Sequence, residues 1–258
     1  MSAAVTLAET WRGGDLLAEI TVSRPGKLNV IGRAAMRALR ETCAALAARP
    51  ELRCVVLRGA GERAFIGGAD IDEMAVLEPA SARQFITDLH GVCASLRALP
   101  VPVIARIEGY ALGAGLEIAC ACDLRIAAET ARFGMPEVKV GIPSVIEAAL
   151  LPRLIGDARA REMVLLGEIF AAEEMARWGL ISRMVAPERL DAAIDAAIGA
   201  VLAAGREALR LQKILCRQWE NLPLDAAIAA GIDSFARAFE GPEPRARLGA
   251  FVARKRGG

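Results

Sequence analysis

Up to about residue 185, the apolar and polar positions form two kinds of pattern: short apolar runs, and longer stretches with helical spacing. Short, nearly continuous apolar runs are typical of buried strands. These runs are residues 15–22, 52–57, 101–107, 124–127 and 180–185. Amphipathic stretches with helical spacing lie between several of them, at 33–48, 79–98, 157–166 and 171–178. Strands that alternate with helices favour parallel pairing and an α/β fold, with irregular segments expected at 59–71 and 128–156.

The C-terminal part has helical spacing throughout. From Pro187 onward the spacing is broken only near Gly205, Leu222-Pro223 and Gly241-Pro242. Apolar residues such as Trp219 and Phe235 are more numerous here than on a solvated helix, so they must cover the core or another subunit. We therefore expect an α/β core over residues 1–195 and a helical region over residues 196–258.

Composition and charge exclude several classes of function. The 258 residues are 54% hydrophobic, and 32 basic against 31 acidic residues give a net charge of +1. Such a balance does not indicate a nucleic-acid partner. No window approaches ~18 uncharged apolar residues and no signal-peptide pattern begins the chain, so we expect no membrane span. The six cysteines are scattered, mostly in apolar runs, which indicates reduced thiols and a cytoplasmic protein.

Metal, serine-nucleophile and nicotinamide chemistry are poorly supported. The Cys120-x-Cys122 pair lacks zinc spacing and a second pair of ligands. A Ser-His-Asp site would have to use the single histidine, His90, and no Gly-x-Ser-x-Gly motif accompanies it. We expect His90 on a helix surface. The Gly59-x-Gly61 motif resembles a dinucleotide loop, but Gly67-Gly68 interrupts the helix that such a loop requires.

Residues 109–123 carry the strongest candidate chemistry. Small residues at Gly113, Ala114 and Gly115 precede an apolar run that contains one acid, Glu117. The free N–H groups at a helix start attract negative charge, and a residue one turn further along shares their face. This segment predicts an anion-stabilising backbone beside an acid/base carboxylate. The alternative is a tight turn into a core helix, with Glu117 at its solvated edge.

A second small-residue segment is Gly67-Gly68-Ala69-Asp70. Its backbone N–H groups can approach a ligand oxygen. Asp70 is suited to cap a short helix that carries Asp72, Glu73 and Met74, so we expect a structural role for it rather than a catalytic one.

Together these segments resemble the crotonase family, which comprises enoyl-CoA hydratases and isomerases. The resemblance covers nearly the whole chain, in order and at natural spacings. It rests on residues 24–29 (Arg-Pro-Gly-Lys-Leu-Asn), 65–71 (Phe-Ile-Gly-Gly-Ala-Asp-Ile), 109–123, 133–138 (Phe-Gly-Met-Pro-Glu-Val) and parts of 167–181.

The resemblance implies a spiral of repeated ββα units in two stacked sheets, followed by a helical trimerisation region. It also implies an acyl-CoA thioester as substrate, with no metal or redox cofactor, because CoA is part of the substrate. A homotrimer or a dimer of trimers is the implied assembly.

The resemblance further assigns roles to individual residues. The backbone N–H groups of Ala69 and Ala114 would form an oxyanion hole, Glu117 would activate water and Glu137 would protonate C2. The alternative for Glu137 is that it is a surface residue after a proline turn. The alternative for Arg254 is that it belongs to a solvated basic tail. The residues implied to contact the substrate or its CoA are Lys27, Leu28, Gly68, Asp70, Ile71, Asp72, Gly113, Phe251 and Arg254.

One segment departs from the family pattern. Where the family has a glycine-rich turn, this chain has Ser144, Val145, Ile146 and Glu147. These bulkier residues should narrow or reshape the acyl pocket, and Glu147 is either a third acid near the site or an ordinary acid at a helix start. The expected activity is the addition of water to a 2-enoyl-CoA. A double-bond isomerase and a non-catalytic acyl-CoA-binding protein are the alternatives.

Overall fold

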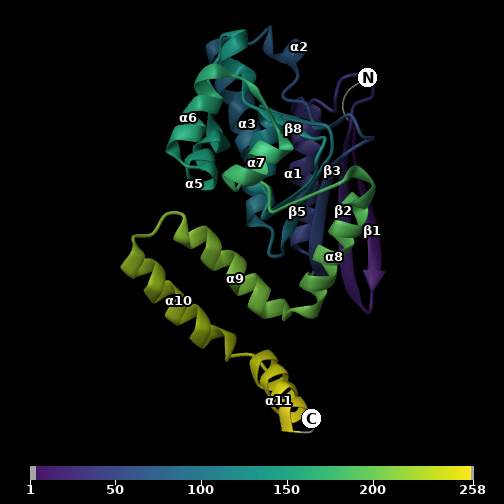
Figure 1. Ribbon diagram of the computed structural model, residues 1–258, viewed down its shortest axis with the longest axis vertical. Helices are drawn as coiled ribbons and strands as arrows, with labels where there is room; N and C mark the ends of the chain where they lie inside the picture. Colours follow the sequence, from purple (N-terminus) through teal and green to yellow (C-terminus); the bar gives the residue numbers. More distant parts are fainter. Residues whose placement is uncertain (1–3, 257–258) are drawn as a thin grey trace. The chain divides into compact units, whose positions relative to one another are not determined.

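The larger of two sheets in the fold has six strands, most of which are parallel (Figure 1). The computed structural model describes residues 4–256. In spatial order the strands are β1 (Ala4–Arg12), β2 (Asp15–Ser23), β3 (Leu52–Gly59), β5 (Val103–Ile107), β7 (Leu124–Ala128) and β10 (Arg183–Val185). Only β1 is antiparallel to its neighbour. The five apolar runs therefore form the parallel sheet that their pattern predicts.

A second sheet is built from three-residue strands, and the sequence pattern did not predict it. Its spatial order is β4 (Ala64–Ile66), β6 (Tyr110–Leu112), β8 (Arg132–Gly134) and β9 (Ile169–Ala171). The expectation that 59–71 and 128–156 are wholly irregular is thus wrong. Three residues are too few to show a period, so such strands are invisible to a pattern search.

The two sheets are connected by a repeated unit. β3, β5 and β7 of the first sheet lead directly into β4, β6 and β8 of the second, and each of these short strands is followed by a helix. Those helices are α2 (Ile71–Met74), α4 (Ala114–Ala121) and the 3-10 helix η1 (Pro136–Val140). Because β4, β6 and β8 pair in parallel, their C-terminal ends meet at one edge of the second sheet.

Strand β1 was also missed. Most of its residues are exposed, so the apolar alternation of a half-buried strand is absent. It joins β2 through Gly13-Gly14, which have φ of 58° and 86°, as the tight turn of a two-residue hairpin requires.

Long helices cover the first sheet. α1 (Arg33–Ala47) and α3 (Pro79–Ala98) pack against each other beside the sheet (Figure 1). Their buried positions repeat every three or four residues, as Met36, Leu39 and Cys43 show on α1. The remaining elements of this part are the 3-10 helices η2 (Ile146–Leu150) and η3 (Pro187–Arg189), and the helices α5 (Leu151–Ile155), α6 (Asp157–Leu166) and α7 (Ala172–Trp178).

A buried arginine holds the C-terminal end of α4. The Arg125 guanidinium donates to the carbonyl oxygens of Cys122 at 2.7 Å, Ala119 at 3.3 Å and Leu180 at 2.6 Å. A cation suits the negative end of a helix dipole, and it satisfies carbonyl groups that would otherwise lack partners. Arg125 therefore ties α4 to the segment before β10.

The chain divides into two compact units, with the boundary between Ile198 and Gly199. α8 (Leu190–Ala203) crosses this boundary, and α9 (Arg206–Trp219), α10 (Leu224–Ala238) and α11 (Glu243–Arg256) follow it. Within the second unit, α9 and α10 pack together, and Glu243 accepts hydrogen bonds from the N–H groups of Glu207 and Ala208 at the start of α9. None of the described helices combines the length and apolar character needed to cross a membrane.

Candidate active site

The backbones of the two small-residue segments lie against each other. A Cβ atom on Gly115 would overlap the carbonyl oxygen of Ile66, and one on Gly68 would lie 3.6 Å from the carbonyl oxygen of Leu112. The paired strands β4 and β6 end here, side by side. Glycine at position 115 permits the close approach, and glycine at position 68 permits a φ of 125°.

The amides of Ala69 and Ala114 stand at the ends of these strands. Ile31 donates to the carbonyl oxygen of Gly68 at 2.9 Å and accepts from the N–H of Asp70 at 3.0 Å. In a parallel bridge these two bonds leave the N–H of Ala69 on the other side of the backbone. Ala114 is the first residue of α4, where N–H groups have no partner within the helix. Both residues line the same cavity.

Glu117 is buried at this cavity, with only 3% of its surface exposed. Its Oε1 accepts a hydrogen bond from the Ala148 N–H at 3.1 Å. Burial raises the pKa of Glu117 to about 8; the Ala148 N–H opposes this shift, and the charges of Glu137 and Glu147 add to it. The alternative interpretation, a residue at a solvated helix edge, is therefore wrong.

Glu137 reaches the same cavity from η1. The hydroxyl of Ser144 donates to its Oε2 at 2.8 Å. A Cβ atom on Gly113 would overlap its Oε1, so this oxygen lies against the start of α4. Gly113 has a φ of 49°, which favours glycine for a second reason. Glu137 is half-buried and held in place, unlike a free surface residue after a turn.

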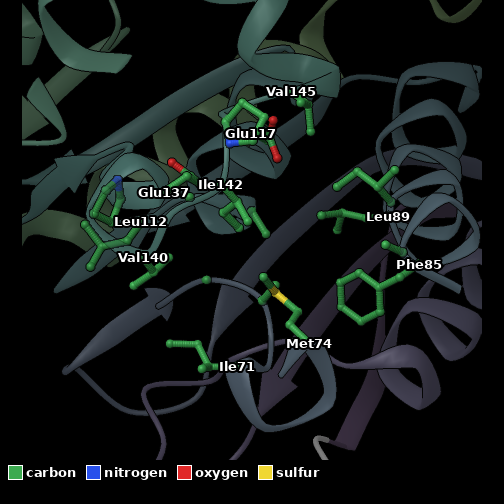
Figure 2. Close-up of a pocket in the computed structure, with 18 of the residues that line it drawn as sticks. Ile71, Met74, Phe85, Leu89, Leu112, Glu117, Glu137, Val140, Ile142 and Val145 are labelled. Carbon is green, nitrogen blue, oxygen red and sulfur yellow. The ribbon is translucent and has the colours of Figure 1, made fainter. Parts of the chain in front are cut away.

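The cavity has a volume of about 700 Å³ and a mainly apolar lining. Figure 2 shows the carboxyl groups of Glu117 and Glu137 on one side and Met74 and Phe85 on the other. Its larger apolar side chains come from α2 and the residues after it, from α3, from the end of β6 and from the segment after Glu137. They are Ile71, Met74, Leu77, Phe85, Ile86, Leu89, Leu112, Val140, Ile142 and Val145.

The predicted substrate contacts divide into three groups. Gly68, Ile71 and Gly113 line the cavity together with the two alanines. Four others stand behind or beside it. Asp70 is buried, caps α2 by accepting from the Asp72 N–H at 3.2 Å, and pairs with Arg24, which agrees with a structural role.

Lys27, Leu28 and Asp72 are not among the residues that line the cavity. Lys27 pairs with Asp72 in an exposed ion pair. The carbonyl oxygen of Leu28 accepts from the Gly67 N–H at 2.8 Å. Phe251 and Arg254 are exposed residues of α11 in the second unit, and their contact with CoA stays a prediction.

Sequence reasoning did not find the groups that hold the two acids. Ser144 begins the segment that departs from the family pattern and Ala148 directly follows it, and each donates to one carboxylate. Ile146, between them, has a φ of 37°, a region that usually favours glycine. The chain thus keeps a glycine-like turn there without glycine. The apolar wall on α3 could have been found, because Phe85 and Leu89 share its buried face at helical spacing.

Comparison with known proteins agrees with this site. The profile of the family described as "Enoyl-CoA hydratase/isomerase" matches residues 13–256. This chain belongs to that family. The "Crotonyl-CoA hydratase" of Syntrophomonas wolfei is 32% identical over 241 residues, which cover 93% of each protein.

Solved structures of the enoyl-CoA hydratase/isomerase family have the same fold. The enoyl-CoA hydratase from Bacillus anthracis has a TM-score of 0.90 and 28% identity, covering 98% of this chain and 97% of that one. The enoyl-CoA hydratase from Mycobacterium smegmatis has a TM-score of 0.91 and 29% identity, covering 96% of each chain. The predictions of a crotonase-type fold and of an enzyme of this family are confirmed.

Proposed function

We propose that this protein is an enoyl-CoA hydratase, which adds water across the 2,3 double bond of a 2-enoyl-CoA thioester. One observation carries the proposal: two carboxylates, Glu117 and Glu137, and two candidate amide donors, Ala69 and Ala114, line one cavity. The apolar lining suits an acyl chain, and the relatives named above are hydratases.

The two amides supply the electrostatic part of the chemistry. Attack at C3 moves negative charge onto the thioester oxygen, where the N–H groups of Ala69 and Ala114 donate to it. Fixed donors stabilise this charge without reorganising, and the loss of one donor from a comparable site costs ~2.7–4 kcal/mol. The first turn of α4 adds the positive end of its dipole.

The two acids move the protons. Glu117 starts ionised and takes a proton from the attacking water, whose oxygen bonds to C3, while Glu137 starts protonated and delivers its proton to C2; a proton then passes from Glu117 to Glu137 and restores both acids. A pKa of about 8 makes Glu117 a stronger base than an ordinary carboxylate. Because Glu117 must be ionised to accept this proton, we expect an ascending limb of kcat against pH with its midpoint near pH 8. Ser144 keeps Glu137 in place through its bond to Oε2.

The test uses crotonyl-CoA and follows the loss of the conjugated thioester absorbance. Glu117→Gln and Glu137→Gln should each lower kcat by about 10²- to 10⁴-fold, because each removes one proton-transfer group while keeping the side-chain shape. Glu162→Gln is the matched control, since Glu162 is an exposed acid on α6 that pairs with Arg159. Full activity in either cavity variant would contradict the two-acid mechanism.

The same assay separates the alternatives. A 3-enoyl-CoA that gains conjugated absorbance, with no net hydration of crotonyl-CoA, would indicate an isomerase. Binding of an acyl-CoA without turnover would indicate a non-catalytic protein. Hydration transfers no electrons, and the two amides and two acids supply the polarisation and the proton transfers, so we propose that no metal or redox cofactor is needed, and turnover should survive exhaustive treatment with a chelator.

We also propose a homotrimer, or a dimer of trimers, for the assembly. Leu224, Ile228, Ile232 and Phe235 form one exposed apolar stripe along α10, from 55% to 75% exposed. Exposed apolar stripes of this kind mark interaction surfaces. Sedimentation equilibrium should give three or six copies, and Ile232→Glu should lower that number.

A further inference from the structure

The candidate amide of Ala69 lies on a loop rather than on a helix or a strand. β4 ends at Ile66 and α2 begins at Ile71, so Ala69 belongs to neither element. The other candidate amide, that of Ala114, is the first of α4 and takes its direction from that helix. An oxyanion hole requires donors that are already fixed when the substrate arrives, and a loop by itself fixes a group less precisely than a helix does. The Ala69 N–H therefore needs a separate support.

That support is the segment of residues 28–31, which runs beside the loop. The carbonyl oxygen of Leu28 accepts from the Gly67 N–H at 2.8 Å. Ile31 forms the two hydrogen bonds described above to the residues on either side of Ala69. Three main-chain hydrogen bonds thus connect the loop to this segment, so the direction of the Ala69 N–H follows the position of residues 28–31.

The backbone of this segment has a conformation that its residue types do not favour by themselves. Leu28 and Asn29 have φ of 50° and 55°, in the left-handed region that few residues other than glycine adopt. Asparagine enters this region more readily than leucine, because its short polar side chain can form local hydrogen bonds. Two such residues in succession persist only where the surrounding structure holds them in place.

The side chain of Asn29 provides this hold. It is buried, and its Oδ1 accepts from the Arg24 N–H at 3.0 Å. Its Nδ2 donates to the carbonyl oxygens of Ala60 at 3.0 Å and Ala64 at 2.8 Å, so both N–H bonds of the amide group are used. Ala60 follows β3 and Ala64 begins β4, so one side chain ties the turn between these strands to residues 28–31.

Leu28 and Asn29 together hold both ends of β4. Asn29 contacts the first residue of the strand, Ala64, while Leu28 contacts Gly67, directly after the last one. The strand has only three residues, so it has few hydrogen bonds of its own to fix the point at which the loop begins. Asn29 is not among the residues that line the cavity, so it can act on a bound molecule only through the loop.

We propose that Asn29 is a positioning residue for the oxyanion hole. Its three hydrogen bonds fix residues 28–31 against the start of β4, and this arrangement directs the Ala69 N–H into the cavity. The inference rests on the proposed function, because it requires a thioester oxygen that accepts from this N–H.

Two variants remove the hold of Asn29 without forcing the backbone out of its conformation. Asn29→Gly loses all three hydrogen bonds and keeps a residue that readily adopts a φ of 55°. Asn29→Asp keeps the shape and the acceptor for Arg24, but it replaces the donating amide group by an oxygen that faces two carbonyl oxygens. Asn221→Asp is the matched control, because Asn221 is exposed in the second unit.

The direct test measures the thioester carbonyl of bound [1-¹³C]butyryl-CoA by isotope-edited infrared difference spectroscopy. This saturated analogue of crotonyl-CoA has no double bond to hydrate, so it stays intact on the enzyme. Hydrogen bonds to the carbonyl oxygen weaken the C=O bond, so binding to wild type should lower its stretching frequency relative to the ligand in water. Both Asn29 variants should lose part of this shift, as should Ala114→Pro, while Asn221→Asp should keep it. The full shift in both Asn29 variants would overturn the proposal.

The kinetic test uses crotonyl-CoA. We expect kcat to fall about 10²-fold in both Asn29 variants with KM within a few-fold of wild type, because the donors act mainly in the transition state and a misplacement of about 1 Å can cost this much. If Asn29 served stability alone, its loss would reduce the folded fraction and the apparent kcat. The carbonyl frequency of the ligand that does bind would then match wild type, which would overturn the proposal.

Gly67→Ala tests the same contact from the side of the loop and does not depend on the folding of the Asn29 variants. Its Cβ would lie 2.7 Å from the Leu28 Cβ and 2.8 Å from the Leu28 carbonyl oxygen, so it separates the loop from residues 28–31. The carbonyl shift should again be partly lost, and a full shift would contradict the proposal. Absence of the shift in wild type would refute the oxyanion hole and this inference with it, whereas a shift that survives in the variants refutes the positioning role alone.

Discussion

Replacing Glu117 with glutamine should stabilise the protein at high pH, although it lowers the proposed activity. The carboxyl is buried and its pKa rises from an ordinary value of 4.5 to about 8. Between these two values the folded protein keeps a proton that the unfolded chain has lost. Stability therefore falls as the pH rises through this interval, and the loss is complete above the folded-state pKa.

The size of the effect follows from the same two values. At ~1.36 kcal/mol per pH unit, the interval from 4.5 to about 8 limits the cost of ionised Glu117 to about 5 kcal/mol. The glutamine side chain keeps an oxygen for the Ala148 N–H but buries an amide group, which costs ~1–3 kcal/mol when it lacks a partner. We expect a net stabilisation of about 2–4 kcal/mol near pH 9 and none below about pH 5.

Equilibrium unfolding in urea, at steps from about pH 5 to about pH 9, measures this difference. The curves of wild type and Glu117→Gln should coincide or favour wild type at low pH and diverge above neutrality, with the variant more stable. Glu162→Gln, which removes an exposed carboxylate, should follow wild type throughout. Parallel curves for wild type and Glu117→Gln over the whole range would show that Glu117 is not held protonated by burial, and the reasoning would fail.

Two further predictions concern the groups around the acids. Ser144→Ala removes the hydroxyl that donates to Glu137 Oε2, so kcat with crotonyl-CoA should fall about tenfold, while an unchanged rate would mean that this bond does not position Glu137. Ala114→Pro removes one amide donor at a helix position that tolerates proline, so kcat should fall by about 10²- to 10³-fold with the circular dichroism spectrum retained. Activity within a few-fold of wild type in Ala114→Pro would exclude this amide from the oxyanion hole.

Much of the fold could be predicted because its longer strands and helices show a characteristic spacing of apolar residues within a short stretch of sequence. The run at 52–57 and the amphipathic stretch at 33–48 match β3 and α1 nearly residue for residue. The three-residue strands could not be predicted in this way. β4, for example, is held by its pairing with β6, whose residues lie more than 40 positions further along the chain.

The candidate site was likewise predictable where it depends on adjacent residues and unpredictable where it depends on distant ones. The start of α4 at Ala114 and the place of Glu117 one turn later were predicted, because a helix start depends on adjacent residues. The partners of the acids were not. Ser144 was recognised only as part of a departure from a family pattern, and Ala148 was not singled out at all.

The amino-acid sequence by itself determined the five parallel strands of the first sheet, the long helices between them, and the two small-residue segments that carry the candidate amides. These properties depend on side-chain size, polarity and spacing over a few residues. The tertiary structure alone decided that Glu117 is buried, that its pKa rises, and that Ser144 and Ala148 donate hydrogen bonds to the two acids. Burial and charge coupling depend on distances between segments far apart in the chain, and only the folded protein sets those distances.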